Sequence, residues 1–173
     1  MADVLTHVLV GFLIGTLLSV RYDWLGPEFV TLVMIGALSP DFVKIDMVIP
    51  GETVAALLGI PFSWSPLHVL AGTVIVVLLG SLLVAPEYRT RAIALFFVGA
   101  VSHHVLDLLL ISTTGYSYAV FWPVTEVRFP RGDLYLSSDR GPVMVVGALA
   151  VVVWYGRERL DSMGRNPPAG TEE

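Results

Sequence analysis

The chain has no cysteine and a single lysine, and only 14% of its 173 residues are charged. Without cysteine it cannot form disulfides or thiolate nucleophiles, and any bound metal must use nitrogen and oxygen ligands. Without a cluster of Lys or Arg it lacks the basic patch typical of nucleic-acid binding. What remains is largely apolar: 55% of the residues are hydrophobic and the mean hydropathy is +0.76. This chain is more apolar than ordinary soluble domains, which predicts an integral membrane protein.

Apolar runs separated by short links predict four or five membrane spans, because a helix of roughly 20 apolar residues crosses a bilayer. Pro40 and three charged residues interrupt the second run, so we expect that helix to break near Pro40. No basic residue precedes the first run, so we interpret it as a retained span rather than a signal peptide. The expected spans are Val4–Val20, Phe29 to about Ile49, Leu67–Ala85, Ala92–Ile111 and Val143–Tyr155.

These runs predict an all-α, multi-pass bundle in the cell membrane. Residues 1–160 form one transmembrane domain in this interpretation. The segment 161–173 is polar and rich in Pro and Gly, which predicts a disordered tail.

Ionisable side chains stand inside the fourth run, in the stretch GAVSHHVLDLLL from Gly99 to Leu110. An Asp at the centre of a membrane helix costs about 2.5–3.5 kcal/mol to insert, so Asp107 needs a partner. His103 precedes it by four residues and His104 by three, so either imidazole can share its helix face. A His–Asp pair that only fixes helix packing is one explanation, and a functional site is the other.

The order of the spans brings further polar residues to the same side of the membrane. His7 begins the first span, Asp41 lies where the second returns, and His68 opens the third from that side. The fourth span comes back to this face, and Asp107 lies four residues before its last apolar residue, about 6 Å below the face. Imidazole nitrogens and carboxylate oxygens suit Zn, Mn or Fe. We therefore predict a metal site formed by His7, Asp41, His68, His103 or His104, and Asp107.

The loop that follows the fourth span emerges at this face and contains FWPVTEVRFPRGD. Glu126 is a candidate general base in this loop, and Asp41 is a second candidate catalytic carboxylate. Arg128 or Arg131 is a candidate for holding an anionic group of a substrate.

Five short motifs occur in a fixed order between Thr6 and Phe129. They are a Thr-His with a following Gly (Thr6, His7, Gly11), a Gly-x-Leu-x-Pro-Asp-like segment (Gly36, Pro40, Asp41), Leu67-His68 in place of Thr-His, a Gly-x-x-Ser-His-x-x-x-Asp (Gly99, Ser102, His103, Asp107), and a Trp-Pro with a following Arg-Phe (Trp122, Pro123, Arg128, Phe129). In this combination the chain resembles the YdjM-type family of membrane-bound, metal-dependent hydrolases.

The resemblance favours His103 over His104 as the metal ligand, a choice that spacing alone leaves open. It implies metal-dependent hydrolysis, and the donor types favour Zn first and Mn or Fe next. Because the site lies near headgroup depth, we expect the substrate to be a phosphoester or other ester in a lipid or envelope molecule. Members of the family often have a His-Arg pair shortly before the third-span Thr-His. Here the segment reads FSWSPLH and has neither residue. This departure leaves the five predicted ligands in place.

A second function class uses the same residues differently. A metal or proton transporter, or a sensor, would also place His and Asp inside the membrane. The sequence shows no inverted repeat and no second ionisable cluster leading to the other face, which favours the hydrolase. Four Lys and Arg fall on the side of the cluster and six on the opposite side, so the positive-inside rule predicts a site that faces outward.

Overall fold

The computed structural model describes residues 3–165, and this part of the chain is helical, with two isolated β-bridges in its loops. The elements in chain order are α1 (Val4–Arg21), α2 (Pro27–Leu38), the 3₁₀ helix η1 (Ser39–Met47), α3 (Gly51–Leu58), the 3₁₀ helix η2 (Ser65–His68), α4 (Leu70–Ser81), the 3₁₀ helix η3 (Pro86–Tyr88), α5 (Arg89–Leu108) and α6 (Gly141–Arg165). The all-α prediction is confirmed for the described residues. Of the predicted tail, 161–165 continue α6 and 166–173 lie outside the described residues.

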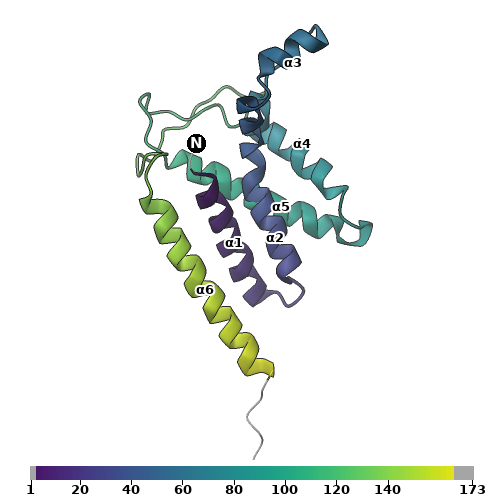
Figure 1. The fold of residues 1–173 in the computed structure, drawn as a ribbon, viewed down its shortest axis with the longest axis vertical. Coiled ribbons are helices and arrows are strands. Elements are labelled where there is room, and N and C mark those ends of the chain that lie inside the picture. The colour runs from purple at the N-terminus through teal and green to yellow at the C-terminus, as the bar shows by residue number, and fades with distance from the viewer. Residues whose placement is uncertain (1–2, 166–173) are drawn as a thin grey trace, which may run out of the picture.

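Helices α1, α2 and α5 form the centre of the bundle, and α6 lies along the outer side of α1 (Figure 1). Two glycines allow α2 and α5 to approach each other closely. A Cβ on Gly36 would lie 2.1 Å from the carbonyl oxygen of Phe96, and one on Gly99 would lie 2.0 Å from that of Val33. Any larger residue would therefore push the two helices apart, and this crossing fixes where His103 and Asp107 lie relative to α2.

Helix α1 turns small and polar residues inward, and many large apolar residues of the bundle lie outside. The residues buried on α1 are Thr6, His7, Gly11, Gly15, Thr16 and Ser19. Leu17 and Leu79 point outward with 58% and 60% of their surface exposed. Small-residue contacts and an apolar exterior are typical of helices that pack in lipid.

Two helices are long and apolar enough to cross a membrane within residues 3–165: Val4–Arg21, and Pro86–Leu108, which includes η3. The prediction of four or five spans is therefore not confirmed. The predicted second span ends as an α-helix at Leu38, and η1 begins at Ser39, so the break expected near Pro40 is present. Pro40 explains it, since it has no N–H with which to continue the helical hydrogen bonds.

The third and fifth predicted spans also differ from expectation. Val69 has extended backbone between η2 and α4, so the third run yields a helix of 12 residues. The last run forms the 25-residue helix α6, whose C-terminal half includes Arg157, Glu158 and Arg159. The second and third apolar runs thus continue through segments that are not α-helical and are longer than their helices, whereas the fifth run is shorter than α6.

Candidate metal centre

Four elements place His and Asp side chains in one buried cluster: His7 on α1, Asp41 on η1, His68 on η2, and His103 with Asp107 on α5. Two overlapping groups of donors could each hold a metal ion. One is His7, His103 and Asp107, and the other is Asp41, His68 and His103; within each, the donor atoms lie within 4.8 Å of one another. Because His103 belongs to both groups, the five residues form a single cluster.

Asp107 lies at the centre of this cluster. Its Oδ1 is 3.5 Å from His7 Nε2, and its Oδ2 is 2.9 Å from His68 Nε2 and 3.7 Å from His103 Nε2. His7, His103 and Asp107 are at most 2% exposed, whereas the His68 side chain is 12% exposed. The cluster is therefore reached most easily from the side of His68.

Backbone carbonyls fix the orientation of two of the imidazoles. His103 Nδ1 lies 2.8 Å from the carbonyl oxygen of Ala37, and His68 Nδ1 lies 3.1 Å from that of Pro40. A carbonyl can only accept, so Nδ1 carries the proton in both rings. In the neutral rings both Nε2 atoms then carry a lone pair, so the 2.9 Å contact between His68 Nε2 and Asp107 Oδ2 joins two acceptors and requires a proton or a cation between them. A ligating His commonly donates its other N–H to a carbonyl in this way.

The end of α2 supplies these acceptors because of its sequence. Pro40 has no N–H and cannot donate to the carbonyl of Ala37, three residues before it. Ser39 satisfies another late carbonyl of α2, since its Oγ donates to Gly36 O at 2.8 Å. The carbonyl of Ala37 is thus available to His103.

Several buried atoms of the cluster make no hydrogen bond within the described part of the chain. They are Nδ1 and Nε2 of His7, Oδ1 of Asp41 and Nε2 of His103. Buried polar atoms without partners are costly. Donors about 2.0–2.2 Å from a tetrahedral ion stand about 3.3–3.6 Å apart, which is close to the separations of 2.9–3.7 Å around Asp107. The residues therefore fit a divalent cation.

Asp41 differs from Asp107 because a lysine already contacts it. Lys44 Nζ donates to Asp41 Oδ2 at 2.8 Å, while Oδ1 is buried without a partner. Lys44 lies one helical turn after Asp41 on η1 and holds the carboxylate in one orientation. In the sequence Lys44 is an interruption of the second apolar run and one of the four basic residues on the cluster side, and nothing there indicates its contact with Asp41.

His104 faces a different set of partners. Its Nε2 lies 3.0 Å from Thr73 Oγ1 on α4, and its Nδ1 lies 2.7 Å from the Tyr118 hydroxyl. Both ring nitrogens are thus satisfied by the protein, and His104 belongs to neither donor group. The structure places His103 in the cluster, as the family resemblance favoured.

Tyr118 is the residue that the sequence did not single out. Its ring centroid lies 4.7 Å from that of His68. Burial, and next the charge of Asp107, raise the pKa of the Tyr118 phenol, so the hydroxyl stays protonated. The only signal in the sequence was its place in the loop that emerges at the face of the cluster.

The loop residues predicted to assist catalysis lie less deep. Glu126 and Arg128 are exposed and belong to neither donor group. Arg131 is half-buried, and its charge partly opposes the rise in the pKa of Tyr118 that burial and Asp107 cause. Its Nε is buried without a hydrogen bond in the described chain. Arg131 is thus the loop arginine near the cluster. The catalytic roles of Glu126 and Asp41 stay predictions.

The family described as YdjM inner membrane protein has a sequence model that matches residues 1–163. The chain belongs to this family. The match spans all five cluster residues, Tyr118 and Arg131. Membership in the YdjM family supports a membrane location, in agreement with the apolar exterior of the bundle. No curated protein and no solved structure matches the chain.

Proposed function

We propose that this YdjM-family protein is a membrane-bound, metal-dependent hydrolase that cleaves a phosphoester or other ester in a lipid or envelope molecule. One observation carries the proposal. The Nε2 atoms of His68 and His103 are directed at Asp107 while carbonyls hold their Nδ1 protons. Such an arrangement of neutral imidazoles around a buried carboxylate is the donor set that a divalent ion requires.

His7, His68, His103, Asp107 and Oδ1 of Asp41 would hold the ion, Zn first and Mn or Fe next. A bound divalent ion supplies Lewis acidity and lowers the pKa of a coordinated water. The protein would contribute orientation, since the carbonyls of Ala37 and Pro40 prevent the His103 and His68 rings from turning. The overlap of the two donor groups at His103 is compatible with one ion or with two.

A hydrolase also needs a proton acceptor and a group that holds the substrate. Asp41 Oδ1 is buried beside His68 and has no hydrogen bond in the described chain, so it is suited to accept a proton if it does not ligate. Glu126 is the alternative acceptor, and it would have to move inward from its exposed position. Arg131 would hold an anionic oxygen of the substrate, because a guanidinium binds phosphate through several N–H groups.

The position of the cluster supports a substrate in the membrane. Asp107 lies one residue before the C-terminal end of α5 at Leu108, and His7 lies in the first turn of α1. In both candidate spans these ionisable residues therefore lie near one end of the helix, close to headgroup depth, rather than at the bilayer centre. An ester bond in a lipid or envelope molecule lies at this depth.

The transporter alternative requires a polar path to the other end of the bundle. Beyond the Gly36–Gly99 crossing the interior contains an apolar core of Leu25, Phe29, Val30, Val33 and Leu95, and the buried Ser19 hydroxyl there donates to the Thr16 carbonyl of its own helix. This core supports hydrolysis at one face over passage through the molecule.

Metal content per chain tests the proposal, measured by elemental mass spectrometry on detergent-purified protein. Wild type should hold one or more equivalents of Zn, Mn or Fe, and Asp41→Ala and Asp107→Ala should lose it. His104→Ala is the matched control, because His104 is adjacent to His103 but bonds only Thr73 and Tyr118. If folded wild-type protein takes up no metal after reloading, the hydrolase proposal fails.

Metal-loaded protein is then assayed against lipid phosphoesters and carboxylic esters in mixed micelles, beside ion flux in proteoliposomes. Turnover that disappears in Asp107→Ala supports the hydrolase. Metal-dependent flux without turnover would replace it with the transporter.

A further inference from the structure

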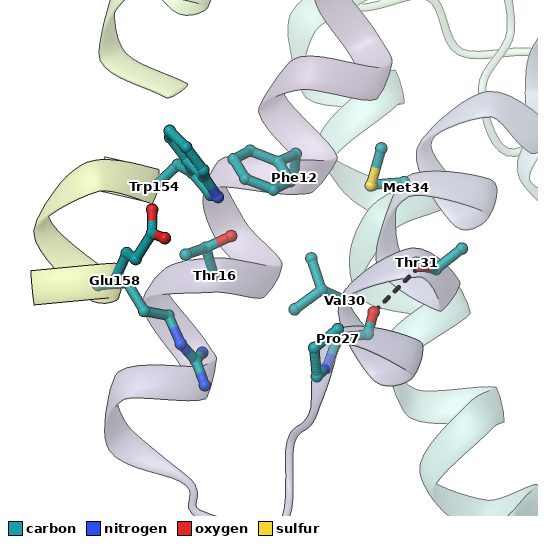
Figure 2. A pocket seen from close by; sticks show the side chains of 9 residues that line it. Phe12, Thr16, Pro27, Val30, Thr31, Met34, Trp154 and Glu158 are labelled. Carbon is teal, nitrogen blue, oxygen red and sulfur yellow. Dashed lines mark hydrogen bonds between the residues drawn. The ribbon is translucent and has the colours of Figure 1, made fainter. Parts of the chain in front are cut away.

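A cavity lies at the opposite end of the bundle from the histidine cluster. It has a volume of about 430 Å³ and lies between α1, α2 and α6. Figure 2 shows Phe12 and Thr16 on α1, Val30 and Met34 on α2, and Trp154 on α6 around the same space. Its wall is mainly apolar, and this site is independent of the proposed hydrolysis.

The cavity runs from the membrane interior toward one membrane surface. Phe12 lies near the middle of the candidate span Val4–Arg21, five residues beyond His7, which is about 7.5 Å along a helix. Pro27, at the start of α2, and Arg157 line the cavity at the end near Arg21. The cavity therefore extends from mid-membrane depth to the leaflet opposite the cluster.

Two opposite charges stand at the same mouth. Arg157 and Glu158 are consecutive on α6, and both line the cavity. Arg157 is half-buried and Glu158 is exposed. A guanidinium binds phosphate oxygens, and a carboxylate accepts hydrogen bonds from a primary ammonium. An anionic headgroup would meet repulsion from Glu158, whereas a zwitterionic headgroup matches both charges.

We propose that this cavity binds one glycerophospholipid with a phosphoethanolamine headgroup. An acyl chain lies along Phe12 and Met34, the phosphate contacts Arg157, and the ammonium contacts Glu158. An apolar cavity open at bilayer depth is filled by lipid rather than by water, which selects an acyl chain as the occupant. Trp154 lies beside the charged pair, as is common for tryptophan at headgroup level.

Native mass spectrometry of the full, delipidated chain tests this proposal, with added phosphatidylethanolamine, phosphatidylcholine and phosphatidylglycerol of identical acyl chains. Wild type should bind one phosphatidylethanolamine about tenfold more tightly than phosphatidylglycerol. Phosphatidylcholine should fall between them, because its quaternary ammonium carries no N–H to donate.

Two variants address the two parts of the site. Thr31→Trp should abolish the tight stoichiometric binding, because the exposed Thr31 side chain lines the cavity and an indole there would fill it. Glu158→Gln should keep binding and lose the preference over phosphatidylglycerol. The matched controls are Ile35→Trp, at an exposed α2 position one turn further along, and Arg159→Gln on α6. Both should behave like wild type.

Equal affinity for all three lipids, unchanged by Thr31→Trp, would overturn the proposal and leave only non-specific annular lipid. A cavity filled instead by a second copy of the chain would give a dimer that Thr31→Trp dissociates, and this result also overturns it. If Thr31→Trp does not fold, the headgroup preference of Glu158→Gln decides. Failure of metal binding at the cluster would affect none of these readings.

Discussion

The two ends of the bundle differ in what they bury: ionisable side chains at one end and apolar side chains at the other. At one end, α1 and α5 bury His7, His103 and Asp107 with almost no exposed surface. At the other end, α2 and α5 bury Val33 and Leu95 in an apolar core. Apolar packing is stable without any ligand, whereas buried polar atoms without partners destabilise the fold. The comparison teaches that the cluster end needs a ligand to offset the cost of its buried polar atoms, which is expected of a functional site.

The crossing that separates the two ends is the place where a substitution should have the largest effect. In Gly99→Ala the new Cβ would meet the Val33 carbonyl at 2.0 Å, and overpacking even against mobile side chains costs about 1–3 kcal/mol. Because backbone cannot move aside, we expect loss of folded protein, seen as aggregation in gel filtration and a collapsed Tm. Gly156→Ala is the control, since nothing lies within 4 Å of its added Cβ. A Gly99→Ala protein with wild-type Tm would contradict the close crossing.

Removal of His103 should show that metal binding depends on the cluster end of the bundle. His103→Ala should weaken Zn²⁺ binding by more than the 10- to 100-fold, or about 1.4–2.7 kcal/mol, typical of losing an outer-shell partner. His104→Ala should change it by less than that, because its partners are Thr73 and Tyr118. Competition with a fluorescent chelator measures both affinities. Equal losses in the two variants would show that the histidines act together.

A substitution that leaves a packing defect in the apolar core should lower stability without changing metal binding. Leu25 is 1% exposed in the core with Phe29 and Val33, so Leu25→Ala should destabilise the protein by at least about 2 kcal/mol. The number of metal ions per chain should stay that of wild type. Thermal unfolding in detergent and elemental analysis of the same sample give the two values. Loss of metal from a folded Leu25→Ala protein would show that the ends are coupled.

The smallest effect is expected beside the cluster. Tyr118→Phe removes the hydroxyl that lies 2.7 Å from His104 Nδ1, and a hydrogen bond of this kind contributes about 1 kcal/mol. Burial raises the pKa of Tyr118 above its unfolded value of about 10. The wild type should therefore keep its advantage over Tyr118→Phe below about pH 10 and lose it as the pH rises further. Urea unfolding of both proteins at pH 8 and above pH 10 measures the difference, and an unchanged difference would contradict the buried phenol.

The sequence predicted the meeting of His7, Asp41, His68, His103 and Asp107 because hydropathy runs specify which membrane face each residue approaches. It predicted the break at Pro40 because proline has a local effect on backbone hydrogen bonding. The ligand roles of these residues stay predictions. The sequence could not predict the lengths of α2 and α4, since hydropathy does not distinguish an α-helix from an apolar 3₁₀ or extended segment. The partners of His104 were also hidden, because Thr73 is on another helix and Tyr118 is in an irregular loop.

The carbonyls of Ala37 and Pro40 fix two histidine rings of the cluster during folding. They orient His103 and His68 through the backbone alone, so both rings are held in place as soon as the chain folds. If the cluster holds an ion, as proposed, these two rings lose little further side-chain freedom on binding. Because Pro40 has no N–H to donate to the Ala37 carbonyl, that carbonyl accepts the Nδ1 proton of His103, which lies 63 residues after Pro40 in the chain. The orientation of the two histidines therefore depends on the backbone where α2 ends and η1 begins.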